Sequence, residues 1–416
     1  MVSRSQAPRT FRAFNNASYR RLWLATFLSM MSRSMQLTLL FWLVLELTNS
    51  PGRVAMVAFW GSLPMLLLGI VGGILADRFN RHRLITLTLI LSWIVTLAMT
   101  VTLYVGLVEY WHAYIVAFLV GMAFPLEMPS RRSIIHELLG NTELTNGIAL
   151  DTLGMSASKM LGPAVAGVLI VLIDIQGGYL VVTVSYTIAV LLMVSLRVSS
   201  TEQDTYSHSS ILRNVWDGIK YVRGHSTILS VVMITFIFNI LLFSYVPMVP
   251  VIARDVLKVG PALVGVLMAA DGVGALLGAV LVASSPRITH HGRIFLVGSL
   301  VALLFLLLFS LSSWYALSFP LLFLLGMGTA GFSTMQSTIV MLVAKPDLRG
   351  MGLGVIGLAI GAGPLGALFV AGVSTVVSPA FSLGLNASLG IVTVGLIALL
   401  MPSLRQRILP PEKPLS

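Results

Sequence analysis

The chain has 416 residues, of which 57% are hydrophobic and only 10% are charged. A soluble domain has about 25% charged residues, so this composition excludes an ordinary soluble globule and indicates many membrane-spanning segments. The net charge of +11 does not indicate nucleic acid as a partner, because the basic residues fall in short loops between apolar runs. The chain has no cysteine, which excludes disulfides and thiolate metal sites.

Apolar runs long enough to cross a bilayer core of about 30 Å follow one another along the chain. Six lie near residues 22–47, 53–76, 84–107, 112–135, 147–172 and 178–196. Six more lie near 227–250, 262–284, 293–311, 315–343, 351–376 and 380–401. This pattern predicts an all-α membrane protein with 12 transmembrane helices in two six-helix bundles, residues 1–200 and 227–416.

The basic residues predict the orientation in the membrane. An even number of crossings places both termini on one side, and only Arg53, Arg254 and Lys258 fall in loops on the other side. Because loops rich in Lys and Arg stay in the cytosol, we expect both termini there, in a multi-pass protein of the inner cell membrane. Residues 201–226 would link the bundles, with an amphipathic surface helix from residue 211; a plain solvated linker is the alternative.

A dense run of charge, residues 73–83, separates the second and third apolar runs. It reads Gly-Ile-Leu-Ala-Asp-Arg-Phe-Asn-Arg-His-Arg, and it resembles the loop motif of the major facilitator superfamily, with Asn80 at a position where the family prefers glycine. The resemblance implies a transporter that works by alternating access. It also implies a cytosolic gate, in which a carboxylate sits at a helix N-terminus and arginines stay on the cytosolic side, formed by Gly73, Asp77, Arg78, Arg81, Arg131 and Arg132. An ordinary basic turn is the alternative.

The fifth apolar run contains Ser158, Gly162, Pro163 and Gly167. This spacing resembles the motif of proton-driven exporters in the same superfamily, although simple close packing of helices would also use small residues. Residues 11–23, 46–51 and 346–350 are similar to the branch with macrolide efflux pumps and enterobactin exporters. The resemblance implies a proton-coupled exporter of small amphipathic molecules. An importer of the same fold and a lysophospholipid or lipid flippase are the alternatives.

Ionisable residues inside apolar runs are costly, so they are candidates for function. The proton-coupling candidates are carboxylates: Glu127, Asp151 and Asp271. The substrate candidates are a cation near the middle of the first run and polar residues on helices that line the cavity in the superfamily: Arg33, Gln36, Lys159, Asn239 and Gln336. Structural pairing is the alternative, for example between Glu127 and Arg131 one helical turn later.

The chain has no phosphate-binding loop and no conventional metal-ligand spacing. We therefore expect a protein that is not an enzyme and that needs no cofactor beyond the proton gradient. Its partners would be a small-molecule substrate and the lipid bilayer, not nucleic acid, and we expect a monomer.

Overall fold

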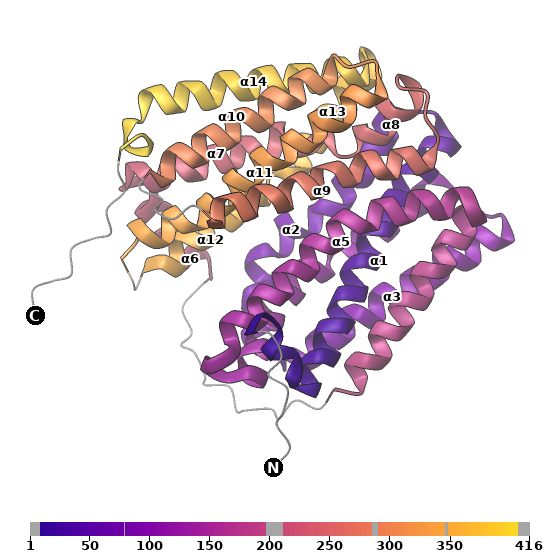
Figure 1. Cartoon of the computed structure of the whole chain (residues 1–416), viewed down its shortest axis with the longest axis horizontal. Helices are drawn as coiled ribbons and strands as arrows, with labels where there is room; N and C mark the ends of the chain where they lie inside the picture. Colours follow the sequence, from indigo (N-terminus) through magenta and orange to yellow (C-terminus); the bar gives the residue numbers. More distant parts are fainter. Residues whose placement is uncertain (1–8, 79, 197–210, 285–289, 346–347, 407–416) are drawn as a thin grey trace, which may run out of the picture.

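The computed structural model describes residues 9–78, 80–196, 211–284, 290–345 and 348–406, without the side chains of residues 9–10, 70–78 and 211–215. Regular structure in these ranges is helical. We call residues 9–196 the N-terminal half and residues 211–406 the C-terminal half. Figure 1 shows the two halves packed side by side, the first in indigo and magenta and the second in orange and yellow.

Six elements form the N-terminal half: η1 (Arg9–Asn15), α1 (Ala17–Thr48), α2 (Pro51–Arg78), α3 (Arg81–Val105), α4 (Tyr110–Gly121) and α5 (Ala123–Val194). The C-terminal half begins with α6 (Ile211–Arg223), α7 (Ser226–Leu241), η2 (Phe243–Tyr245), α8 (Met248–Asp255) and α9 (Pro261–Ser284). It continues with α10 (His291–Ser310), α11 (Tyr315–Val343), α12 (Arg349–Ile360), α13 (Gly363–Val376), α14 (Pro379–Leu400) and η4 (Pro402–Leu404).

The helix termini follow local sequence. Asn16 caps α1 by accepting hydrogen bonds from the backbone N–H groups of Ser18 and Tyr19, and Asn80 caps α3 in the same way. Asn49, after α1, and Gly106, after α3, have positive φ values of 46° and 76°. Asparagine and glycine adopt this left-handed conformation more readily than other residues, so they end the helices there.

The long helix α5 is three helical segments joined without a loop. Its backbone is non-helical at Gly140, Ile173 and Asp174. The described residues contain ten stretches long and apolar enough to cross a membrane, and one of them covers 85 residues, Tyr110–Val194. The all-α membrane fold is confirmed. Dividing that stretch at the two breaks would bring the ten stretches to the twelve crossings that the sequence predicts, and this number stays a prediction.

Successive crossings bring the turns to two opposite ends of the bundle. We call the end with the turns at Asn49, Gly106 and Asp174 the Asn49 end. The other, with the start of α1, the turn at Gly140 and helix α6, is the Gly140 end. The expected amphipathic helix is present as α6, and it packs against α12. The halves meet where α5 packs on α9 (Figure 1) and where α2 packs on α13.

Candidate functional site

A cavity of about 340 Å³ lies between the two halves. Its N-terminal wall comes from α1, α2, α4 and the start of α5, and its C-terminal wall from α7, η2, α12 and α13. Most of the lining is apolar. The polar lining residues are Arg33, Gln36, Ser62, Asn239 and Ser244.

Arg33 lies halfway along α1 and is the cation of this cavity. Its guanidinium carbon is 5.1 Å from the centre of the Phe124 ring, a cation–π contact. The charge of Glu127 also acts on it electrostatically. Arg33 thus lines an interior space between the halves, and its role in binding substrate stays a prediction.

Glu127 is buried in α5 next to this cavity. Its Oε1 accepts a hydrogen bond of 3.0 Å from the hydroxyl of Thr88 in α3. The pair with Arg131, which was the alternative interpretation, does not form: Arg131 pairs with Asp151 instead. Pro129 lies between the two residues in α5. The Glu127 side chain reaches α3, whereas that of Arg131 reaches α1 and a later segment of α5.

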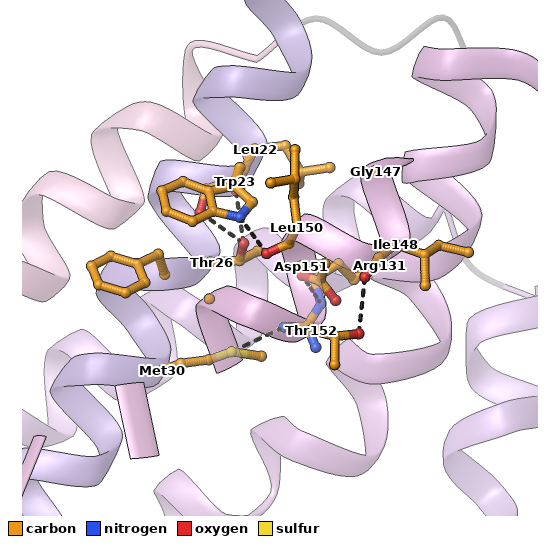
Figure 2. A network of polar contacts seen from close by, with 12 residues as sticks. Leu22, Trp23, Thr26, Met30, Arg131, Gly147, Ile148, Leu150, Asp151 and Thr152 are labelled. Atoms are coloured by element: carbon orange, nitrogen blue, oxygen red, sulfur yellow. Dashed lines mark hydrogen bonds and ion pairs between the residues drawn. The ribbon is translucent and has the colours of Figure 1, made fainter. Parts of the chain in front are cut away.

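Arg131 and Asp151 form a buried ion pair within the N-terminal half. The Nε of Arg131 lies 3.1 Å from Oδ1 of Asp151, and their side chains are 3% and 11% exposed. Figure 2 shows the pair close to α1, where the indole N–H of Trp23 donates to the carbonyl oxygen of Leu150 at 2.9 Å. The Nη1 of Arg131 also reaches the sulfur of Met30 at 3.7 Å. These contacts tie α1 to two segments of α5.

Lys159 and Asp271 form an ion pair that joins the two halves. Lys159 lies on α5 and Asp271 on α9, with 3.1 Å between Nζ and Oδ2. The Asp271 side chain is 8% exposed, whereas that of Lys159 is 55% exposed. The second carboxylate oxygen, Oδ1, is buried without a hydrogen-bond partner. Sequence reasoning found no cation for Asp271 on its own helix; the partner comes from the other half.

Three predicted amide residues lie on helices facing the interior. Gln36 donates to the hydroxyl of Thr96 at 3.0 Å, and Gln336 donates to the hydroxyl of Thr235 at 2.7 Å. Asn239 lines the cavity and donates to the backbone oxygen of Thr235 at 2.9 Å. Gln336 is buried between α11 and α7 and is not part of the cavity lining.

Sequence reasoning missed a row of buried hydroxyls along α3. Residues four apart lie on one face of a helix, and this spacing was the signal that could have revealed them. The row consists of Thr88, Ser92, Thr96 and Thr100. Two of these hydroxyls bond the candidate residues: that of Thr88 donates to Glu127, and that of Thr96 accepts from Gln36.

The exporter-type motif lies where α5 passes between α1 and α9. A Cβ at Gly162 would come within 2.5 Å of Ser34 in α1. On α9, a Cβ at Gly265 would collide with the carbonyl oxygen of Pro163, and Gly167 lies directly opposite Gly265. Ser158 donates to the backbone oxygen of Gly154 at 2.8 Å. The small residues therefore allow two close helix crossings, one of them between the halves.

The structure describes the side chains of only some residues of the predicted gate. Gly73, Asp77 and Arg78 lie in the last turns of α2, where side chains are outside the described part, so their contacts stay a prediction. Arg81 begins α3 and is half-buried, and Arg132 is exposed. Arg131 faces Asp151, as described above.

Comparison with known proteins identifies the family. A family model described as transmembrane secretion effector matches residues 9–411. The chain belongs to the transmembrane secretion effector family. Its relatives are named as transporters and efflux pumps and not as enzymes, in agreement with the sequence prediction.

Relatives of this chain are named for the transport of several different compounds. The staphyloferrin A transporter of Staphylococcus aureus is 25% identical over 57% of this chain and 59% of its own length. The alignment thus covers less than two thirds of that relative. The multidrug efflux pump Tap of Mycobacterium tuberculosis is 24% identical over 89% of this chain and 90% of its own. Macrolide efflux protein A of Streptococcus pyogenes is 24% identical over 62% of this chain and 64% of its own.

Solved structures show the same fold. A peptide transporter superposes with a TM-score of 0.74 at 14% identity, over 93% of this chain and 94% of that one. A nucleoside transporter superposes with a TM-score of 0.72 at 12% identity, over 94% of this chain and 100% of that one. At such low identity the likeness is one of fold alone.

Proposed function

We propose that this secretion effector exports small amphipathic molecules by alternating access, as a monomer whose energy source is proton exchange. The observation that carries the proposal is the cavity of about 340 Å³ whose walls come from both halves. A site placed between two bundles can face each side of the membrane in turn when the bundles rock against each other.

Contacts between the halves indicate which end is closed. The Nη1 of Arg254, on α8, donates to the backbone oxygen of Leu45 at 3.1 Å and to Oδ1 of Asn49 at 2.9 Å. It thereby supplies positive charge to the C-terminal end of α1, where free carbonyl groups favour a cation. If both termini lie in the cytosol, as the basic loops predict, the Asn49 end faces the outside. Its contacts would then close that side, as expected for the state in which an exporter loads its cargo.

The names of the relatives support export. Two are efflux proteins for drugs or macrolides, and one carries the siderophore name staphyloferrin A. Buried carboxylates support proton coupling, because a carboxylate away from water can exchange a proton as its surroundings change. The structure offers three of them: Glu127, Asp151 and Asp271.

The test is transport by cells that lack their own pumps and by inverted membrane vesicles. Cells with the protein should accumulate less of a fluorescent drug, a macrolide or a siderophore, and a protonophore should abolish the difference. Inverted vesicles should take up the same compound when their interior is acidified. Unchanged accumulation in cells with equal amounts of membrane-inserted protein would exclude export of these compounds, and a reversed flux would support the importer.

A lipid flippase is the second candidate, and the position of Lys159 favours it. More than half of this side chain is exposed, although it lies in the middle segment of α5, between the breaks at Gly140 and Ile173. Such a cation could receive an anionic head group. Transfer of a fluorescent lysophospholipid between leaflets of proteoliposomes, lost in Lys159→Gln and retained in Arg223→Gln, would support this function over drug export.

A further inference from the structure

We infer that the cavity selects amphipathic anions, that is, molecules with an apolar body that present a carboxylate or similar acid to Arg33. The inference rests on the proposed function and names the substrate class of that same site. It starts from charge: among the lining residues, all of which the structure describes, Arg33 is the one ionisable side chain.

The charge of Arg33 is incompletely compensated. No carboxylate in the described residues forms an ion pair with it, and Glu127 acts on it only through space while being hydrogen-bonded to Thr88. The Phe124 ring stabilises one face of the guanidinium. A cation in an apolar cavity is costly without a partner, so a ligand that brings a negative charge gains more there than in water.

The geometry of an arginine also favours acids. Its planar guanidinium presents several N–H donors that match the two oxygens of a carboxylate. The amide oxygen Oε1 of the neighbouring Gln36, a residue that is 1% exposed, has no hydrogen-bond partner among the described residues. An amide oxygen only accepts hydrogen bonds, so it would bind an N–H or O–H group of the ligand and not the acid itself.

The remaining walls suit an apolar body. They are formed by residues such as Leu37, Leu40, Phe41, Phe243 and Val246. The volume falls in the range of about 300–1,000 Å³ that is typical of sites for small organic ligands. A ligand with an aromatic or branched apolar body can therefore fill the cavity while its acid reaches Arg33.

Binding to the purified full-length protein in lipid nanodiscs tests this inference without any transport. The probes share one apolar body: naphthylacetate, its neutral amide naphthylacetamide, and naphthylmethylammonium. Calorimetry should show that the wild type binds the acid at least about tenfold more tightly than the amide, equivalent to about 1.4 kcal/mol, and the ammonium most weakly. Arg33→Gln should bind acid and amide equally, and Arg33→Lys should keep part of the preference.

Arg223→Gln is the matched control, because it removes an exposed positive charge at the end of α6, and Arg223 is not part of the cavity lining. It should keep the wild-type preference, and its melting temperature and that of Arg33→Gln should show folded protein. Equal binding of acid and amide by the wild type, or a preference that survives in Arg33→Gln, would overturn the inference, as would no binding of the acid. A protein that exports neutral or cationic drugs without preferring the acid overturns the inference alone. A protein that prefers the acid but transports nothing overturns only the proposed function.

Discussion

The Nζ of Lys159 lies 3.1 Å from Oδ2 of Asp271, and this ion pair connects the two halves of the transporter between α5 and α9. Its two members differ in environment, since the carboxylate is buried and the ammonium is largely exposed. Replacing Lys159 and replacing Asp271 should therefore lower the stability of the protein by unequal amounts.

Replacing Lys159 should cost more stability than replacing Asp271. Lys159→Gln leaves a buried carboxylate without its cation. Because the ammonium is more than half exposed, the cost should lie below the value of about 3–5 kcal/mol that is typical of a pair buried on both sides. Asp271→Asn leaves an ammonium that solvent can reach, so its cost should be smaller. Thermal unfolding in detergent measures both, and the double variant should be more stable than Lys159→Gln alone. Equal melting temperatures for the two single variants would contradict the asymmetry.

The Arg131–Asp151 pair should behave symmetrically, because both side chains are buried. Arg131→Met and Asp151→Leu should each lower stability by several kcal/mol by leaving one buried charge alone, whereas the double variant should recover most of the loss. Thermal unfolding of the four proteins gives the coupling energy. Strictly additive losses would show that the pair does not act as a unit.

The contact of Arg254 with the end of α1 should hold the Asn49 end closed. Because the chain has no cysteine, a reporter disulfide can be introduced directly. A Cβ at Gly52 would come within 2.8 Å of the Thr375 side chain, so Gly52→Cys with Thr375→Cys should cross-link in the closed state. The cross-link should block transport until it is reduced.

Adding Arg254→Gln should slow the formation of this disulfide several-fold, because it removes the two hydrogen bonds to Leu45 and Asn49. Arg223→Gln serves again as the control and should leave the rate unchanged. A cross-linking rate that does not respond to Arg254→Gln would exclude a role for this arginine in closing the Asn49 end.

Glu127 is the carboxylate we expect to couple export to protons. Glu127→Gln cannot release a proton, so it should abolish efflux driven by a pH gradient while leaving exchange of labelled for unlabelled substrate intact. Thr88→Val, which removes the hydrogen bond to Glu127, should weaken the pH-driven efflux, and Thr102→Val on the same helix should not. Loss of exchange together with efflux would indicate that Glu127 is needed for the substrate cycle itself.

The bounds of several helices could be predicted from the apolar runs in the sequence. The expected run 315–343 is α11 (Tyr315–Val343), and the expected run 262–284 begins one residue later than α9 (Pro261–Ser284). The polar turns on both sides of an apolar stretch determine where the helix begins and ends, so its bounds can be predicted without knowing how the helices pack.

Side-chain partners could not be predicted in the same way. Glu127 and Arg131 are one helical turn apart, yet the first bonds to Thr88 and the second to Asp151. Asp271 finds Lys159, a residue from the other half of the chain. Such choices depend on the rotation and depth of each helix against its neighbours, which tertiary packing sets and which a single sequence does not reveal.

The crossing of α5 and α9 at Gly167 and Gly265 has a mechanical consequence. There the backbones of the two halves touch without side chains between them. Interlocked side chains would have to separate before one helix could turn against another, whereas two smooth backbone surfaces can swivel in contact. We therefore expect the two halves to rotate about this crossing while α5 and α9 stay in contact.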